Sequence, residues 1–218
     1  MITVKTFINN PLDENTYVVS DASRQAVIID CGALSATERE AIRQYVLQES
    51  LQPVLFLLTH GHFDHIFGAQ WVSDAYALSP AMLEPELPLY QKGCRQLHEM
   101  FGTHLQFPVP SPGKMLHHGD TLIFGHRTAL HVIATPGHTP GGCCYYIEGP
   151  DPMVFTGDSL FKGGIGRTDF PGGSAAALKD SLTSRILSLP PATTVYPGHG
   201  APTTINAERN SDFLRTFR

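Results

Sequence analysis

The chain is poor in charge and has no long apolar run. Charged residues make up 16% of its 218 positions, and the formal net charge is −5. It therefore carries no basic field that would attract nucleic acid or an anionic membrane surface. No stretch reaches the about 18 apolar residues that mark a membrane span, and the N-terminus has no charged segment followed by an apolar one. We expect a cytoplasmic protein that binds neither nucleic acid nor a membrane.

Cysteine is scarce and forms no recognisable motif. The four cysteines are Cys31, Cys94, Cys143 and Cys144, and none belongs to a C-x-x-C pair. Cys143 and Cys144 are adjacent in a predicted strand, where neighbouring side chains point to opposite faces. We therefore expect free and mostly buried thiols in a reducing compartment.

The chain also lacks any internal repeat, low-complexity tract or Gly/Ser linker that would mark a domain boundary. Hydrophobic residues make up 42% of it, and its length suits one sizeable core better than two. We expect a single domain over residues 1–218.

Hydrophobic periodicity predicts strands and helices that are mixed along the chain. The predicted strands cover residues 16–20, 26–30, 54–58, 121–124, 129–134, 143–147, 153–156 and 194–196. The predicted helices cover residues 36–48, 87–101 and 174–189, with a further short helix after His65. This mixture indicates an α/β fold.

Five of the predicted strands run directly into a residue that can bind a metal. These residues are Asp30, His60, His138, Asp158 and His199. If the strands belong to two stacked sheets, their ends can converge on one rim. Loops at the strand ends of a rigid scaffold often carry reactive side chains. The pattern therefore predicts a site at that rim.

Three histidines and one aspartate lie within six positions of the stretch LLTHGHFDHIFG, as His60, His62, Asp64 and His65. With 11 His and 11 Asp in the chain, the pattern H-x-H-x-D-H would arise by chance in about one such chain in a thousand. A lone histidine on an apolar face is usually structural. The close spacing here favours metal ligands over solvated loop residues.

Seven candidate ligands are more than one tetrahedral ion can use. They are His60, His62, Asp64, His65, His138, Asp158 and His199. Neutral imidazole and carboxylate suit Zn²⁺, Fe and Mn, and a set without thiolate argues against a structural Cys-rich zinc site. Two ions that share one carboxylate would use all seven ligands and leave room for a bridging solvent. The set is therefore typical of a catalytic site.

The motif THGHFDH, followed by His138, Asp158 and His199, resembles the metallo-β-lactamase superfamily. Within it the chain resembles the hydroxyacylglutathione hydrolase (glyoxalase II) group, especially its short bacterial members that lack the C-terminal helical domain. The resemblance covers residues 15–213. It implies a four-layer αββα sandwich, in which two mixed β-sheets are flanked by helices and the metals lie at one edge.

The resemblance implies two divalent metal ions, with Zn²⁺ first and Fe or Mn as alternatives. The ligands would be His60, His62 and His138 for the first ion, and Asp64, His65 and His199 for the second, with Asp158 bridging both. Asp64 and Asp158 are thereby the expected catalytic residues. Asp30 matches an aspartate of the family that supports the ligands without binding metal itself.

The resemblance also implies a reaction. A hydroxide shared by the two ions would attack the carbonyl of a small thioester, such as S-lactoylglutathione or a related 2-hydroxyacylglutathione, as in methylglyoxal detoxification. Arg167 stands where a basic residue of the family contacts the substrate, and Asp169 lies beside it in the motif GRTDF. The alternative for Arg167 and Asp169 is a surface ion pair. Asp158 departs from the antibiotic-hydrolysing classes that carry Cys or Ser at the bridging position.

Two other functions stay open. A persulfide dioxygenase shares the His/His/Asp motif but works with one iron, so that Asp64, His65 and His199 would not fill a second metal site. A catalytically silent metal-binding protein is the third possibility. Larger relatives grip glutathione with a C-terminal helical domain, which the sequence up to Arg218 does not contain. The acyl and thiol parts of the substrate, the native metal and the oligomeric state are not determined by the sequence.

Overall fold

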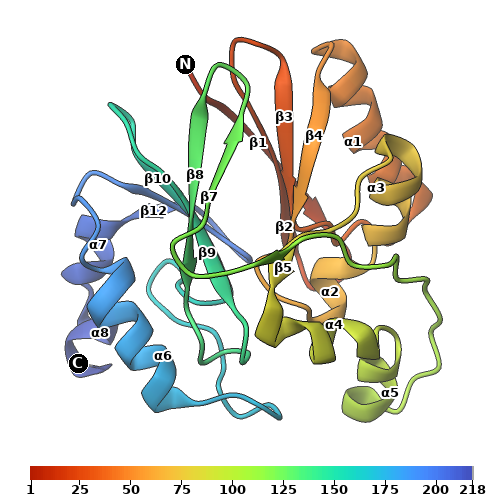
Figure 1. The fold of residues 1–218 in the computed structure, drawn as a ribbon. Helices are drawn as coiled ribbons and strands as arrows, with labels where there is room; N and C mark the ends of the chain where they lie inside the picture. The colour runs from red at the N-terminus through yellow and green to blue at the C-terminus, as the bar shows by residue number, and fades with distance from the viewer. Residues whose placement is uncertain (218) are drawn as a thin grey trace.

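Two mixed β-sheets form the centre of the structure, a computed structural model that describes residues 1–217 (Figure 1). The first sheet has the order β1 (Thr3–Asn9), β2 (Glu14–Ser20), β3 (Gln25–Ile29), β4 (Gln52–Leu57). The second has the order β12 (Thr203–Thr204), β11 (Thr194–Pro197), β10 (Met153–Gly157), β9 (Cys143–Ile147), β8 (Thr128–Ala134), β7 (Thr121–Phe124). Only the β3–β4 and β10–β11 pairs of these sheets are parallel. A separate parallel pair joins β5 (Met82–Leu83) to β6 (Met115–Leu116).

The central strands are apolar on both faces because each sheet is covered on both sides. In β2, Tyr17 and Val19 belong to the inner cluster between the sheets, whereas Val18 belongs to the outer cluster under the helices. In β9, Cys143 likewise faces inward and Cys144 outward. The expectation of free cysteines on opposite faces of this strand is confirmed.

Helices cover both outer faces of the pair of sheets, so the predicted αββα sandwich is confirmed. The first sheet is covered by α1 (Ala36–Gln48), α2 (Phe63–Ile66) and α3 (Ala69–Tyr76). The second is covered by α6 (Ala175–Ser181), a π-helical turn η2 (Leu182–Ile186) and α7 (Ile205–Arg209), with α8 (Asp212–Phe217) beside them. Figure 1 shows α1 and α3 on one side of the sheets and α6, α7 and α8 on the other.

The segment after β5 lies at one edge of the sandwich, and it contains η1 (Glu84–Glu86), α4 (Leu87–Lys92) and α5 (Arg95–Phe101). The predicted continuous helix over 87–101 is wrong. It breaks at Gly93, whose φ of +50° lies outside the helical region. The break turns α5 back toward the end of the sandwich where β4 runs into α2.

Other predicted elements agree with the structure or are extended by it. The helix over 36–48 begins at Ser35, where Ser35 and Glu38 form a reciprocal capping box. Strand β1 was not predicted, because Lys5 and its exposed neighbours interrupt the apolar pattern of a strand at the sheet edge.

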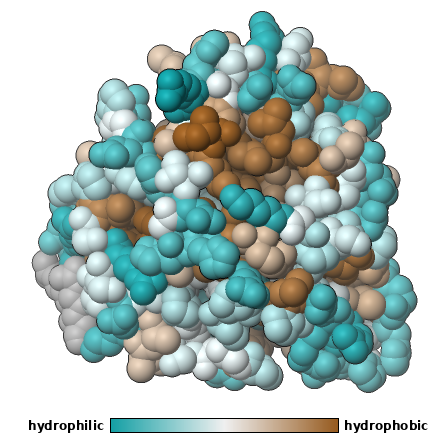
Figure 2. Space-filling model, in the orientation of Figure 1, coloured by the Kyte–Doolittle hydropathy of each residue, from teal (hydrophilic) through white to brown (hydrophobic). Residues whose placement is uncertain are grey.

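The molecular surface in Figure 2 shows apolar side chains gathered where the β7–β8 hairpin lies beside β3 and β4 in Figure 1. This end of the sandwich is opposite the edge that carries α2 and α4. Within residues 1–217, no helix combines the length and the hydropathy that crossing a membrane requires.

The inner cluster predicts a large effect of removing one aromatic ring. Phe155 is fully buried and packs on Tyr17 and Tyr196, with ring centroids 5.2 and 5.1 Å away. Phe155→Ala should lower the free energy of unfolding by about 3–5 kcal/mol in urea denaturation, because a cavity replaces the ring. Ile123→Ala, at a side chain that is 56% exposed, should change it by less than about 0.5 kcal/mol. Equal effects of the two changes would contradict this packing.

Candidate metal centre

All seven predicted ligand side chains meet at one edge of the sandwich, as the pattern of strand ends predicts. His60 and His62 follow β4, and Asp64 and His65 lie in α2. The other three come from the second sheet, with His138 between β8 and β9, Asp158 directly after β10 and His199 after β11.

The side chains form two separate groups, and within each group the ligand atoms all lie within 4.8 Å of one another. The first contains His60, His62 and His138, and the second contains Asp64, His65 and His199. Asp30, His60 and His65 form a third such group, which overlaps the other two. In the first group, Nδ1 of His62 is 2.9 Å from Nε2 of His138. In the second, Nε2 of His199 is 3.3 Å from both Oδ2 of Asp64 and Nε2 of His65. These are the two triads that the resemblance implies.

The carboxylate of Asp158 lies between the two groups. Its Oδ2 is 3.4 Å from Nε2 of His138, and its Oδ1 is 3.3 Å from Nε2 of His65 and 3.7 Å from Nε2 of His199. One oxygen therefore faces each group, which is the arrangement that a bridging ligand requires.

Two buried polar atoms at the centre show whether the site suits a cation. Nε2 of His60 and Oδ1 of Asp158 have no hydrogen-bond partner among the described residues. A buried polar atom without a partner is costly, and a divalent cation would satisfy a ring nitrogen and a carboxylate oxygen together. The donor set therefore fits divalent metal ions.

Backbone carbonyls orient two of the imidazoles. Nδ1 of His138 is 2.7 Å from the carbonyl oxygen of Arg167, and Nδ1 of His199 is 2.9 Å from that of Leu12. Because a carbonyl oxygen only accepts, each Nδ1 carries the proton and donates it. Nε2 of each ring is then left with a lone pair that faces the group, as a metal ligand must be.

Asp30 orients two more imidazoles from behind. Its Oδ2 lies 3.0 Å from Nδ1 of His65 and accepts the Thr59 hydroxyl at 2.7 Å. The Thr59 oxygen is in turn 3.1 Å from Nδ1 of His60, which donates to it. Asp30 has a φ of 55°, a left-handed conformation that aspartate tolerates. One carboxylate thus sets the orientation of a histidine in each group.

Burial keeps two of the histidines neutral. Burial, and then the neighbouring His65, hold the pKa of His60 well below its usual range. Burial and the nearby His138 lower the pKa of His62 to about 4. At neutral pH both rings therefore offer a lone pair, which is the form that binds a metal.

Charge balances the other members of the centre. Burial opposes ionisation of Asp158 and Asp64, but His65 and the other neighbouring histidines together outweigh it and lower the pKa of both carboxyls. Burial likewise opposes the charged form of His65 and of His199, yet the two carboxylates raise the pKa of both rings. A cation must replace the protons of these rings, so its affinity should fall as the pH is lowered.

Glu86 is a site residue that the sequence does not reveal. It is fully buried, and its carboxylate accepts from Gly61 N at 2.8 Å, Thr139 Oγ1 at 2.9 Å and Gly141 N at 2.7 Å. The carbonyl oxygen of Gly61 accepts a further hydrogen bond from Gln96 Nε2 at 2.7 Å. Glu86 therefore ties the loop of His60 and His62 to the loop of His138.

The first residues of β2 hold the loop of His199. The Asn15 side chain donates to the carbonyl oxygens of Pro197 and Gly200, at 3.0 and 2.8 Å. The Tyr17 hydroxyl donates to the same Pro197 oxygen at 2.6 Å. The dense run of polar residues in NNPLDENT is the only indication of this role in the sequence.

Arg167 and Asp169 form the surface ion pair that the sequence leaves as an alternative. Two hydrogen bonds of 2.8 Å join them, and the guanidinium lies 3.8 Å from the ring centroid of Phe170. Arg167 also lines the cavity over the two groups. The backbone at Gly166 passes so close to the carbonyl oxygen of Asp158 that a Cβ would collide with it. Substrate contact by Arg167 and Asp169 stays a prediction.

The family model of the metallo-beta-lactamase superfamily matches residues 9–199. The chain belongs to the metallo-beta-lactamase superfamily. It is 33% identical over 216 residues to the probable metallo-hydrolase YqgX of Bacillus subtilis, with 95% of each chain covered. It is 31% identical over 205 residues to the hydroxyacylglutathione hydrolase GloC of Haemophilus influenzae, with 91% of each covered. It is 35% identical over 186 residues to the mitochondrial persulfide dioxygenase ETHE1 of Bos taurus, covering 84% of this chain and 63% of that protein.

Solved structures of the superfamily have the same fold. The B3 metallo-beta-lactamase BLEG-1 superposes with a TM-score of 0.87 at 32% identity, covering 97% of this chain and 99% of that one. TTHA1623, solved in a di-iron-bound form, superposes with a TM-score of 0.83 at 36% identity, covering 95% and 98%. The predicted superfamily and its fold are confirmed.

Replacing Glu86 tests whether it holds the two histidine loops together. Glu86→Gln should weaken binding of Zn²⁺, measured by competition with a chelator. The amide NH₂ that replaces one carboxylate oxygen would face one of the three groups that now donate to Glu86, namely Gly61 N, Thr139 Oγ1 or Gly141 N. A buried donor without a partner costs about 1–3 kcal/mol. Glu84→Gln is the matched control, since that side chain is 68% exposed. Equal zinc affinities of the two variants would contradict the role of Glu86.

Replacing Asp30 tests the orientation of His60 and His65. Asp30→Asn should lower zinc affinity about 10- to 100-fold, the usual loss when a hydrogen-bond partner of a ligating histidine is removed. Asp74→Asn, at an exposed residue of α3, should leave the affinity unchanged. An unaltered affinity in Asp30→Asn would show that the histidines need no such support.

Proposed function

We propose that this chain is a metal-dependent hydrolase that cleaves a small thioester. The position of the Asp158 carboxylate between two histidine-containing groups carries the proposal, because it suits a pair of ions that share one ligand. His60, His62 and His138 would hold the first ion, and Asp64, His65 and His199 the second.

Divalent ions bound here would supply a Lewis acid for the carbonyl and lower the pKa of water toward neutrality. The chain itself keeps His60 and His62 neutral and Asp158 ionised, so these three ligands are already in their binding forms. Zn²⁺, Fe and Mn all suit imidazole and carboxylate. Iron in the related TTHA1623 structure supports testing that metal beside zinc.

The cavity over the centre suits hydrolysis of a thioester. It has a volume of about 470 Å³, and most of the surface that it exposes is apolar, which suits the apolar parts of a small substrate. Water adds to the carbonyl carbon, the C–S bond breaks, and the products are a carboxylic acid and a thiol. A thiolate is a good leaving group, so the step does not depend on a dedicated general acid.

S-lactoylglutathione is the first substrate to test. The resemblance of the Arg167 loop to glyoxalase II and the hydroxyacylglutathione hydrolase among the relatives both support it. Persulfide dioxygenase is the second candidate, supported by the relative ETHE1. The two reactions differ in an observable way, since the dioxygenase consumes oxygen with one iron.

The experiment combines metal analysis with two assays. The proposal expects two ions per chain and release of free thiol from S-lactoylglutathione or another thioester. One iron per chain with oxygen uptake on glutathione persulfide would establish the second candidate instead. Full metal loading without turnover of any thioester or persulfide would indicate a silent metal-binding protein.

Replacing the proposed shared ligand should remove metal and turnover together. Asp158→Ala removes the carboxylate that the two groups share. The metal content should therefore fall below two ions per chain, and thioesterase activity should be lost. Asp151→Asn, at an exposed turn residue, is the control and should keep both. Full activity of Asp158→Ala would refute the role of this residue.

A further inference from the structure

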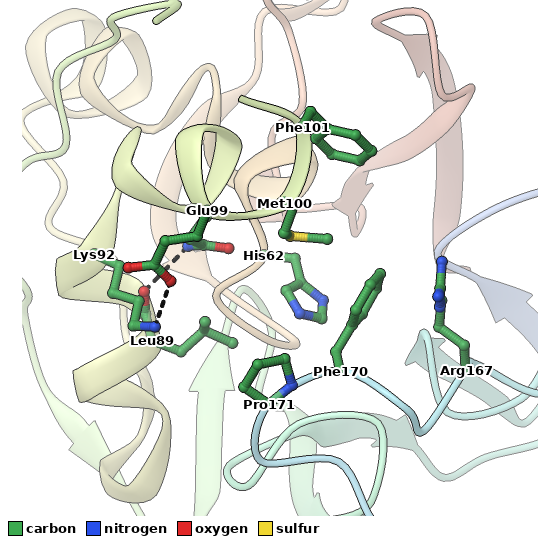
Figure 3. A pocket seen from close by; sticks show the side chains of 10 residues that line it. His62, Leu89, Lys92, Glu99, Met100, Phe101, Arg167, Phe170 and Pro171 are labelled. Carbon is green, nitrogen blue, oxygen red and sulfur yellow. Dashed lines mark hydrogen bonds and ion pairs between the residues drawn. The ribbon is translucent and has the colours of Figure 1, made fainter. Parts of the chain in front are cut away.

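The cleft over the metal centre has a second lobe that no part of the proposed function uses. This side lobe has a volume of about 340 Å³ and lies beside His62 (Figure 3). His62, Met100, Phe101, Arg167 and Phe170 line both the side lobe and the cavity over the centre, so the two are continuous. One arm of a substrate whose carbonyl lies at the centre can therefore extend into the side lobe.

The surface that the side lobe exposes is mostly apolar, although half of its lining residues are polar or charged. Figure 3 shows Leu89, Pro171 and Phe170 around the space, with Met100 and Phe101 from α5 above them. Phe101 is 62% exposed although it is a large aromatic residue. An apolar group in the lobe would remove these surfaces from water, which favours its binding.

The cations of the cleft are already neutralised by carboxylates. At one end of the view in Figure 3, Lys92 Nζ lies 2.7 Å from Glu99 Oε2. At the other end, Arg167 is bound by Asp169 through two hydrogen bonds and stacks on Phe170. A new anion would have to share each cation with the carboxylate that already binds it. The Gln96 side chain also lines the lobe, and its Oε1 has no hydrogen-bond partner among the described residues, but this atom is buried. The cleft therefore offers a charged arm only cations that are already paired.

Glutathione is a poor match to these walls. Its tripeptide carries two carboxylates and one ammonium at neutral pH, and charges that enter an apolar lobe without partners lose their hydration at high cost. A neutral aromatic or alkyl group would instead contact Leu89, Met100 and Phe170 at no such cost.

We propose that the side lobe binds a neutral apolar arm of the thioester, an aryl or medium-length alkyl group, and that the cleft selects such substrates over glutathione thioesters. This inference rests on the proposed thioester hydrolysis. On this proposal Leu89, Met100 and Phe101 determine which substrates bind. The metal centre itself does not distinguish between substrates that differ in the arm.

Two thioesters with the same lactoyl group, one of benzyl thiol and one of glutathione, test the selection. The metal-loaded protein should cleave the benzyl thioester with a kcat/KM about tenfold or more above that of the glutathione thioester. A glutathione thioester that is cleaved as fast or faster would overturn the inference and leave the proposed hydrolase intact.

A binding measurement separates failure of this inference from failure of the proposed function. The neutral thioether 2-(benzylthio)acetamide, which cannot be hydrolysed, should shift the methyl NMR resonances of Leu89 and Met100 in the metal-free protein. S-methylglutathione should not shift them. Binding without any thioester turnover would remove the hydrolase proposal but keep the lobe, whereas no shift with the thioether would overturn the lobe.

A charge placed in the wall gives the mutational test. The quantity to compare is the kcat/KM for the benzyl thioester divided by the kcat/KM for the methyl thioester of the same acyl group. Leu89→Glu should lower this ratio by about tenfold, because the new carboxylate brings water into the lobe. Leu89→Ala should lower the ratio in the same direction by less, and metal content verifies that both variants are folded. Ile123→Glu, at an exposed residue of β7, should leave the ratio unchanged. A ratio that Leu89→Glu does not alter would contradict the proposal.

Discussion

The burial of two carboxylates among imidazoles is the constraint on which the structure of this edge depends. The side chains of Asp64 and Asp158 are 10% and 12% exposed, and they lie within 4 Å of the nitrogens of His65 and His199. Negative charge taken out of water must be matched by positive charge nearby. Protons on the histidines can supply it, and so can divalent cations, which explains why proton and metal binding are coupled at this centre.

A second set of buried polar contacts keeps the ligand loops in place. The loops come from different sheets, and among the described residues single backbone contacts join them, such as the Glu14–His199 bridge and the bond from Cys143 N to the Thr59 oxygen at 2.9 Å. Asp30 joins the end of β3 to His65 and Thr59, and Glu86 joins the loop of Gly61 to that of Gly141. These contacts turn two packed sheets into one rigid frame, which is what a metal centre with fixed geometry requires.

The cleft above the centre combines this rigid floor with walls from a less regular segment. The side lobe owes its shape to the break at Gly93, since a continuous helix over 87–101 could not direct both α4 and α5 toward Phe170. The segment of α4 and α5 therefore contributes walls of the side lobe but none of the seven candidate ligands, whereas His62, Arg167 and Phe170 border both spaces. Such a division allows relatives with the same metal motif to differ in substrate.

Much of the centre could be predicted from local sequence, because H-x-H-x-D-H and the aspartate or histidine after each strand are short patterns with a direct chemical meaning. The apolar strands and the capped helix over 36–48 are equally local. The roles of Glu86, Asn15 and Tyr17, the ion pair of Arg167, and the side lobe were decided only by the tertiary structure. Arg167 and Asp169 are only two residues apart, so the sequence offers their pairing as an alternative, and the structure shows that they pair. The contacts of Glu86, Asn15 and Tyr17 instead depend on partners many residues away, and a buried carboxylate such as Glu86 looks in the sequence like any exposed one.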